Sequence, residues 1–193
     1  HQVILIPHGL LNISVSPTEN ILEEVGCEKF KYLFSPSMNS TEKNVLYELC
    51  ESPEFNNYLR NNGIKMVLRR QIDIKDEYTP NYVFINKYLS KDEYYSLLTY
   101  SNAIIICVGN NFKYRVSGTL FECMRMNKVA FVSRNETLMD YTKYASYKMT
   151  FDNVHELVSQ LEDIGHISDP YKNLEEIADP TIGWNTLLIN YIK

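Results

Sequence analysis

The stretch from Phe112 to Asn127 has the clearest potential for chemistry, because it follows an apolar run and becomes helical in its second half. Ser117, Gly118 and Thr119 fall where this helix would begin. Unpaired backbone N–H groups and the positive end of the helix dipole converge at such a position. A glycine lets an anion approach the backbone, so this spacing indicates a phosphate-binding site. The competing interpretation is an ordinary helix start with a hydroxyl residue as its cap.

Charged residues around this helix start fit the same kind of ligand. Lys113 and Arg115 add positive charge just upstream. Glu122 lies one turn into the helix, where a carboxylate can accept hydrogen bonds from sugar hydroxyls such as a ribose diol. The alternative for Glu122 is a solvated helix face, although its neighbours Phe121 and Cys123 are apolar.

Another loop, which contains Ser37, also links a predicted strand to a predicted helix. Lys43 falls in the first turn of that helix, where a cation is unfavourable unless an anion offsets it. We therefore expect Lys43 to be a second phosphate contact.

Arg69 and Arg70 end the next predicted strand, and arginines there can bind phosphate or carboxylate bidentately. Salt bridges to nearby carboxylates fit the sequence equally well, the candidates being Asp73, Asp76 and Glu77. Tyr88 and Leu89 follow a later strand and are candidates to flank a nucleobase.

Short apolar runs alternate with helical patterns about six times, which predicts an α/β fold with a doubly wound, Rossmann-like parallel sheet and helices on both faces. The predicted strands are Val3–Ile6, Lys31–Phe34, Ile64–Leu68, Tyr82–Ile85, Ala103–Val108, Val129–Val132 and Tyr147–Phe151. Helices are predicted at 19–26, 42–51, 53–62, 90–98, 119–126, 137–144, 154–164 and around Trp184. Ligands of such sheets bind beyond the carboxyl ends of the strands, where the residues above would meet.

The composition suits a globular domain of ordinary size: 193 residues, 45% hydrophobic and 22% charged. The net charge of −5 argues against a chain-wide nucleic-acid interface. No apolar run approaches the roughly 18–20 residues that span a bilayer. The four cysteines lack the spacing of a zinc site, so we expect buried free thiols and a reducing, cytoplasmic compartment.

Several of these segments together resemble a known family, the C-terminal domain of GT-B glycosyltransferases. The resemblance is carried by Tyr88–Tyr94, Ala103–Val108, Lys113–Glu122 and Asn127–Phe131, and the chain is most similar to bacterial retaining enzymes of the family 4 type, which build surface polysaccharides. The loop at Pro7-His8-Gly9 resembles the linker strand of that family, and the Trp184 segment resembles its C-terminal helix. The resemblance implies a linker at 1–12, a nucleotide-sugar-binding domain at 13–178 and a terminal helix at 179–193.

The resemblance also implies roles for individual residues. The diphosphate of a nucleotide sugar would lie at the start of the helix, at Ser117, Gly118 and Thr119. Lys43 matches the family lysine that contacts the diphosphate, and Glu122 matches the second glutamate of the E-x7-E motif, which holds the ribose. The helix dipole and basic side chains would stabilise the leaving nucleoside diphosphate, so neither a metal nor another cofactor is expected.

Two positions depart from the family pattern. Tyr114 stands where the first glutamate of E-x7-E would fall, and Ser37 stands near the position of a basic residue early in its loop. Arg115 or Arg69 are candidates to replace that basic residue.

The resemblance further implies a missing N-terminal acceptor-binding domain, which would be the partner of this chain. The sequence begins with His, and we expect it to be a piece of a longer protein. Any membrane association would come through the missing half, at the inner face of the membrane. The isolated piece is expected to bind donor weakly and to catalyse little.

Two other functions remain open. A GT-B-like sugar-nucleotide epimerase shares the sheet but needs acid–base groups, and His8 is the only histidine near the expected cleft. A non-catalytic nucleotide-binding module such as a receiver needs clustered acids after its first strand, whereas Glu42 is the first acid after Phe34. The sequence has no GxGxxG, GxxxxGK[ST] or GxSxG motif, which disfavours dinucleotide-cofactor, P-loop and α/β-hydrolase proteins.

Overall fold

The computed structural model describes residues 17, 20–36, 43–109 and 117–178, without the side chains of Lys43, Asn44, Glu176 and Ala178. Within these residues, six strands form one parallel sheet in the order β3-β2-β1-β4-β5-β6. The strands are β1 (Lys31–Ser35), β2 (Ile64–Leu68), β3 (Tyr82–Phe84), β4 (Ala103–Ile106), β5 (Ala130–Ser133) and β6 (Thr150–Phe151). The order reverses between β1 and β4, which makes this the switch point of a Rossmann-like doubly wound sheet.

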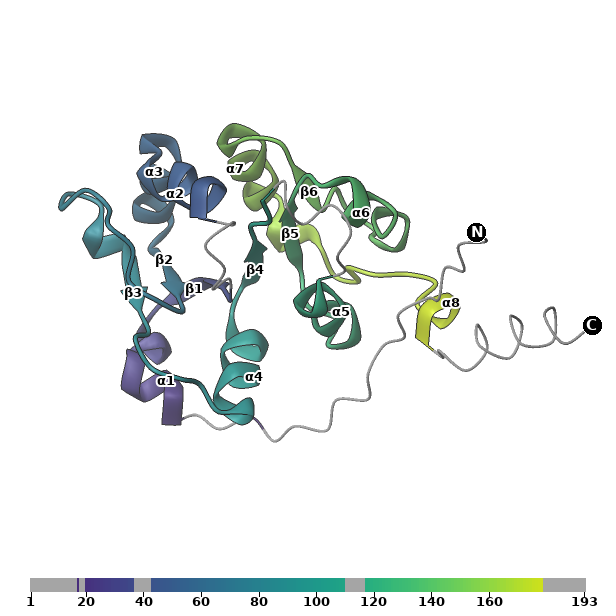
Figure 1. Ribbon diagram of the computed structural model, residues 1–193, viewed down its shortest axis with the longest axis horizontal. Helices are drawn as coiled ribbons and strands as arrows, with labels where there is room; N and C mark the ends of the chain where they lie inside the picture. Colours follow the sequence, from purple (N-terminus) through teal and green to yellow (C-terminus); the bar gives the residue numbers. More distant parts are fainter. Residues whose placement is uncertain (1–16, 18–19, 37–42, 110–116, 179–193) are drawn as a thin grey trace, which may run out of the picture.

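Helices cover both faces of the sheet (Figure 1). One face carries α1 (Asn20–Val25), α4 (Lys91–Tyr100) and α5 (Gly118–Arg125). The opposite face carries α2 (Lys43–Glu51), α3 (Pro53–Asn62) and α7 (Val154–Glu162). The predicted α/β architecture is confirmed.

Strand residues alternate between two hydrophobic cores, as a sheet that is covered on both faces requires. In β4, Ile104 and Ile106 pack towards the core beneath α1, α4 and α5, whereas Ala103 and Ile105 pack towards the other core. Each of these four side chains is buried, which explains why the sequence shows a continuous apolar run here.

Local sequence signals set the helix boundaries. Ser52 caps α3 by accepting a hydrogen bond from Phe55 N, and Gly63 ends that helix in the left-handed region at φ 61°. Ser90 and Glu93 form a capping box at the start of α4.

The segment from 137 to 144 is not the single helix that its pattern predicts. It consists of the short helix α6 (Glu136–Met139), a turn, and the 3₁₀ helix η5 (Thr142–Tyr144). The hydroxyl of Thr142 donates to the Met139 carbonyl at 2.7 Å. This side-chain hydrogen bond gives the carbonyl a partner other than a helical backbone N–H.

The last strand is also shorter than predicted, because Tyr147 does not pair through its backbone. Its hydroxyl accepts from Ala130 N at 2.8 Å and donates to Ala130 O at 2.7 Å. Only Thr150 and Phe151 then continue the ladder. The short helix α8 (Glu175–Ala178) follows in a stretch that was expected to be irregular.

The linker at 1–12 and the terminal helix at 179–193 remain predictions, because they lie outside the described residues. Among the described residues, no helix is long and apolar enough to cross a membrane.

Candidate functional site

A cavity of about 430 Å³ lies at the carboxyl end of the sheet, between the end of β2, the start of α4 and the start of α5. It brings together six of the residues that the sequence singled out, namely Arg69, Tyr88, Leu89, Gly118, Thr119 and Glu122. Ser90, Lys91 and Tyr94 complete its lining. The segments converge at this edge because parallel strands end together, so side chains distant in sequence face one ligand-sized space.

The start of α5 has the ordinary helix cap that its sequence allows, and it also places two residues at the cavity. Ser117 is buried, and its hydroxyl accepts from Leu120 N at 3.3 Å, so Ser117 is the helix cap. Gly118 is exposed and Thr119 is half-buried, and in an α-helix the N–H groups of these first two positions have no intrahelical acceptor. Both residues line the cavity, which therefore lies at the positive end of the helix dipole, a position that favours an anion.

Glu122 is half-buried, so the interpretation as a solvated helix face is wrong. Its Oε2 atom accepts a hydrogen bond from the Tyr94 hydroxyl at 2.8 Å, and its Oε1 atom accepts one from the Tyr95 hydroxyl at 2.9 Å. Burial, together with the nearby Glu122 charge, raises the pKa of Tyr94 above its usual range and that of Tyr95 to about 12. Both hydroxyls therefore stay protonated donors at neutral pH.

Arg69 lines the cavity and has no carboxylate partner in the part of the chain that the structure describes. Its guanidinium lies over the Tyr94 ring, with 5.6 Å between Cζ and the ring centroid. Among the described residues, its Nε atom is buried without a hydrogen-bond partner, and no ion pair joins it to Asp73, Asp76 or Glu77. The salt-bridge interpretation is thus incorrect for Arg69, and its charge is available to a ligand.

The two residues expected to flank a nucleobase behave differently. Tyr88 is 90% exposed at the rim of the cavity, whereas Leu89 is only 4% exposed and packs into the core beneath α4. Tyr88 can therefore cover a ligand, while Leu89 mainly holds the loop against the domain.

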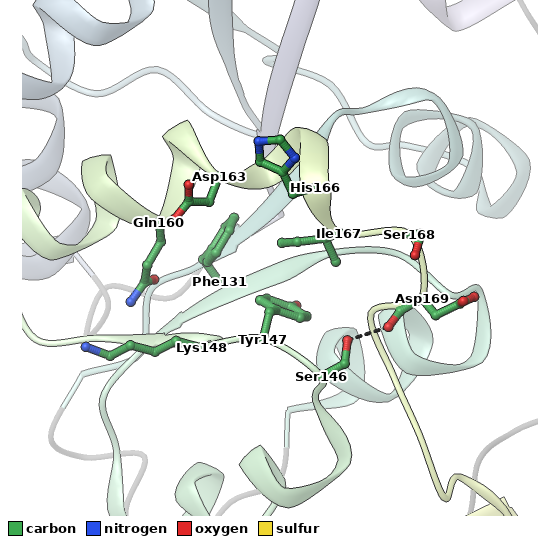
Figure 2. Close-up of a pocket in the computed structure, with 10 residues that line it drawn as sticks. All are labelled: Phe131, Ser146, Tyr147, Lys148, Gln160, Asp163, His166, Ile167, Ser168 and Asp169. Atoms are coloured by element: carbon green, nitrogen blue, oxygen red, sulfur yellow. Dashed lines mark hydrogen bonds between the residues drawn. The ribbon is translucent and has the colours of Figure 1, made fainter.

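A second cavity, of about 590 Å³, lies near the amino ends of β5 and β6 (Figure 2). Figure 2 shows Phe131, Tyr147 and Ile167 near its centre. Carboxylates of Asp163 and Asp169 line it, and its lysine, Lys148, is already paired with Glu156. This charge pattern is less favourable to an anion than that of the cavity beside α5, which is lined by Arg69 and the start of a helix.

Several expectations fall outside the described residues. His8, Ser37, Tyr114 and Arg115 are among them, and of Lys43 only the backbone position at the start of α2 is described. Among the residues that the structure describes, no group of three or more His, Cys, Asp or Glu side chains could hold a metal ion.

The sequence did not single out the two hydroxyls that bind Glu122. Both tyrosines fall in the helix predicted at 90–98, and their pairing with α5 depends on packing between segments about 27 residues apart. Ser35 was missed too: its hydroxyl is buried at the end of β1 without a hydrogen-bond partner among the described residues. Its place directly after the predicted strand Lys31–Phe34 was the only available signal.

Comparison with known proteins gives no further information on the site: no protein-family model matches the chain, and no curated protein matches it significantly.

Proposed function

We propose that this chain is the nucleotide-sugar-binding half of a GT-B glycosyltransferase of the surface-polysaccharide class. One observation carries the proposal: a single cavity at the carboxyl end of the sheet is lined by the start of helix α5, the Glu122 carboxylate and Arg69, which has no ion-pair partner among the described residues. A nucleoside diphosphate has the matching groups, since it joins a diphosphate to a ribose diol and a planar base.

The proposed reaction transfers a glycosyl group from the donor to an acceptor hydroxyl. The bond between the sugar and the diphosphate breaks, and the acceptor oxygen bonds to the sugar carbon while its hydroxyl proton passes to the departing diphosphate or to solvent. The nucleoside diphosphate leaves with the bonding electrons and the negative charge that they bring. The N–H groups of Gly118 and Thr119 would stabilise this charge together with Arg69. Lys43 and Arg115 are the further cations that the family resemblance assigns to the leaving group, in place of a metal ion.

The acceptor, a saccharide or a lipid-linked saccharide, would bind a separate N-terminal domain that faces this edge of the sheet. Because the proposed active site is the cleft between two domains, we expect this half to bind donor nucleotides and not to transfer sugar efficiently alone.

A thermal-shift panel with UDP, GDP, ADP and CMP tests the proposal. We expect one nucleoside diphosphate to raise the midpoint of unfolding at millimolar concentration, because a ligand of the native state stabilises it by mass action. Glu122→Gln should reduce the shift, whereas Glu162→Gln, which removes an equivalent charge from the exposed side of α7, should not. If no nucleotide shifts the wild-type protein, the proposal is rejected.

A further inference from the structure

Glu122 is held by two consecutive residues of a neighbouring helix, Tyr94 and Tyr95, here called the tyrosine pair. Consecutive residues on a helix point about 100° apart, so a carboxylate that meets both hydroxyls must lie with one oxygen towards each. The observed contacts have this form: Tyr94 bonds to Oε2 and Tyr95 bonds to Oε1. The plane of the carboxylate is thereby fixed before a ligand arrives.

The direction of each hydrogen bond follows from the chemistry of the groups. A carboxylate only accepts, so the tyrosine pair donates both protons. Tyr94 has then used its proton, and the Thr119 hydroxyl at 3.2 Å must donate to the Tyr94 oxygen. The Thr119 side chain is therefore directed at Tyr94, and its backbone N–H remains for an anion.

Each carboxylate oxygen can accept about two hydrogen bonds. After the tyrosine pair has taken one position on each oxygen, one position on each remains, and Glu122 lines the cavity. Two adjacent hydroxyls, which each offer one proton, match two acceptor positions on one fixed carboxylate. A ligand that lacks one of these hydroxyls would leave one position empty.

We propose that Tyr94 and Tyr95 are positioning residues that orient Glu122 to accept both hydroxyls of a ribose diol, so that this cavity selects ribonucleotides over 2′-deoxyribonucleotides. The inference rests on the proposed nucleotide-binding function. It adds that the site recognises the ribose diol of the nucleotide. In this arrangement the hydroxyls of the tyrosine pair act on the ligand through Glu122, and Tyr94 also lines the cavity.

The experiment compares dissociation constants for UDP, GDP and ADP with those for their 2′-deoxy forms by calorimetry. The wild-type protein should bind the preferred ribonucleotide roughly tenfold more tightly than its 2′-deoxy form, since one hydrogen bond to a charged group is lost. Tyr95→Phe and Tyr94→Phe should each reduce this ratio to about threefold or less, with little change in the affinity for the 2′-deoxy form.

Tyr100→Phe is the matched control, because Tyr100 lies at the other end of α4 and is 46% exposed. It should leave the ratio unchanged, and circular dichroism checks that each variant is folded. If the tyrosine pair only supports the fold, its variants should lose affinity for the ribonucleotide and the 2′-deoxy form equally, and that result overturns the inference. An unchanged ratio in both variants also overturns it. Absence of any binding to the wild-type protein would instead reject the proposed function, and the inference with it.

Discussion

The guanidinium of Arg69 lies over the ring of Tyr94, with 5.6 Å between its Cζ atom and the ring centroid. An aromatic face attracts a cation without neutralising it, unlike a carboxylate. The contact therefore holds Arg69 at the cavity while its charge stays available. The same tyrosine bonds to Glu122, so one side chain positions a cation and contacts an anion at the same site.

Replacing Arg69 by Met should weaken the binding of the preferred nucleoside diphosphate about tenfold or more, because a charge-assisted contact to phosphate is lost. The dependence of the dissociation constant on salt concentration should also become less steep. Arg69→Lys should restore the affinity only in part, since an ammonium lacks the planar fork of a guanidinium. Calorimetry at two or more salt concentrations measures both effects.

The control for this prediction is Arg60→Met, which removes the same charge from an exposed position near the end of α3. Equal losses of affinity in the Arg69 and Arg60 variants would show that only net charge matters, contrary to a contact at the cavity.

Gly118 offers a test in which stability and binding move in opposite directions. A Cβ atom at Gly118 would meet no described atom within 4 Å, and its backbone is helical. Gly118→Ala should therefore raise the free energy of unfolding by about 0.4–1 kcal/mol, because alanine lowers the conformational entropy of the unfolded chain. The same methyl group would obstruct an anion that approaches the backbone N–H groups, so nucleotide affinity should fall.

Urea unfolding and calorimetry on the Gly118→Ala protein give the two quantities. A variant that is more stable and binds nucleotide as well as the wild type does would place the anion elsewhere.

The fold could be predicted from the sequence because its signals are local. Apolar runs such as Ala103–Val108 mark strands buried on both faces, and Ser52, Ser90 and Gly63 mark helix ends through their own caps. The doubly wound topology then follows from the alternation of strands and helices.

The tyrosine pair could not be predicted in this way, and neither could the short β6. Their hydrogen bonds join segments far apart in the sequence, as when Tyr147 bonds to the backbone of Ala130. The sequence around a single tyrosine does not indicate which distant residue its hydroxyl will bond to. In the candidate site, the sequence singled out most of the residues that line the cavity and missed the two hydroxyls that bond to Glu122.

All four cysteines of the chain are buried free thiols, as predicted. Burial raises the pKa of both Cys27 and Cys50 to about 12. We expect the thiols of the native protein to react far more slowly with a disulfide reagent at pH 8 than those of the unfolded chain, because the thiolate is the reactive form and all four thiols are buried. In denaturant, all four should react, and the absorbance of the coloured thiol that the reagent releases gives their number.

Because of these raised thiol pKa values, we expect the free energy of unfolding to depend on pH in the alkaline range. Well below pH 9, the ordinary pKa of a thiol, these thiols are protonated in both states, and their contribution to stability is complete. As the pH rises from about 9 towards 12, they ionise in the unfolded chain and stay protonated in the native one, so the free energy of unfolding falls. Urea unfolding should give a smaller decline between pH 8 and 9.5 for Cys50→Ala than for the wild type.

Near the edge of the sheet, the side chain of Tyr147 makes the hydrogen bonds that a neighbouring strand would otherwise make. Its hydroxyl supplies both a donor and an acceptor to the backbone of Ala130, and the register that pairs Val132 with Thr150 begins only beyond it. Tyr147→Phe leaves that N–H and C=O without partners, so we expect a loss of about 1–3 kcal/mol in the free energy of unfolding. Hydrogen exchange at the Ala130 amide should become faster, whereas Tyr100→Phe, at an exposed tyrosine, should change neither quantity. Unchanged stability and exchange in the Tyr147 variant would mean that the backbone of Ala130 finds other partners, and that the side chain does not replace a strand at this edge.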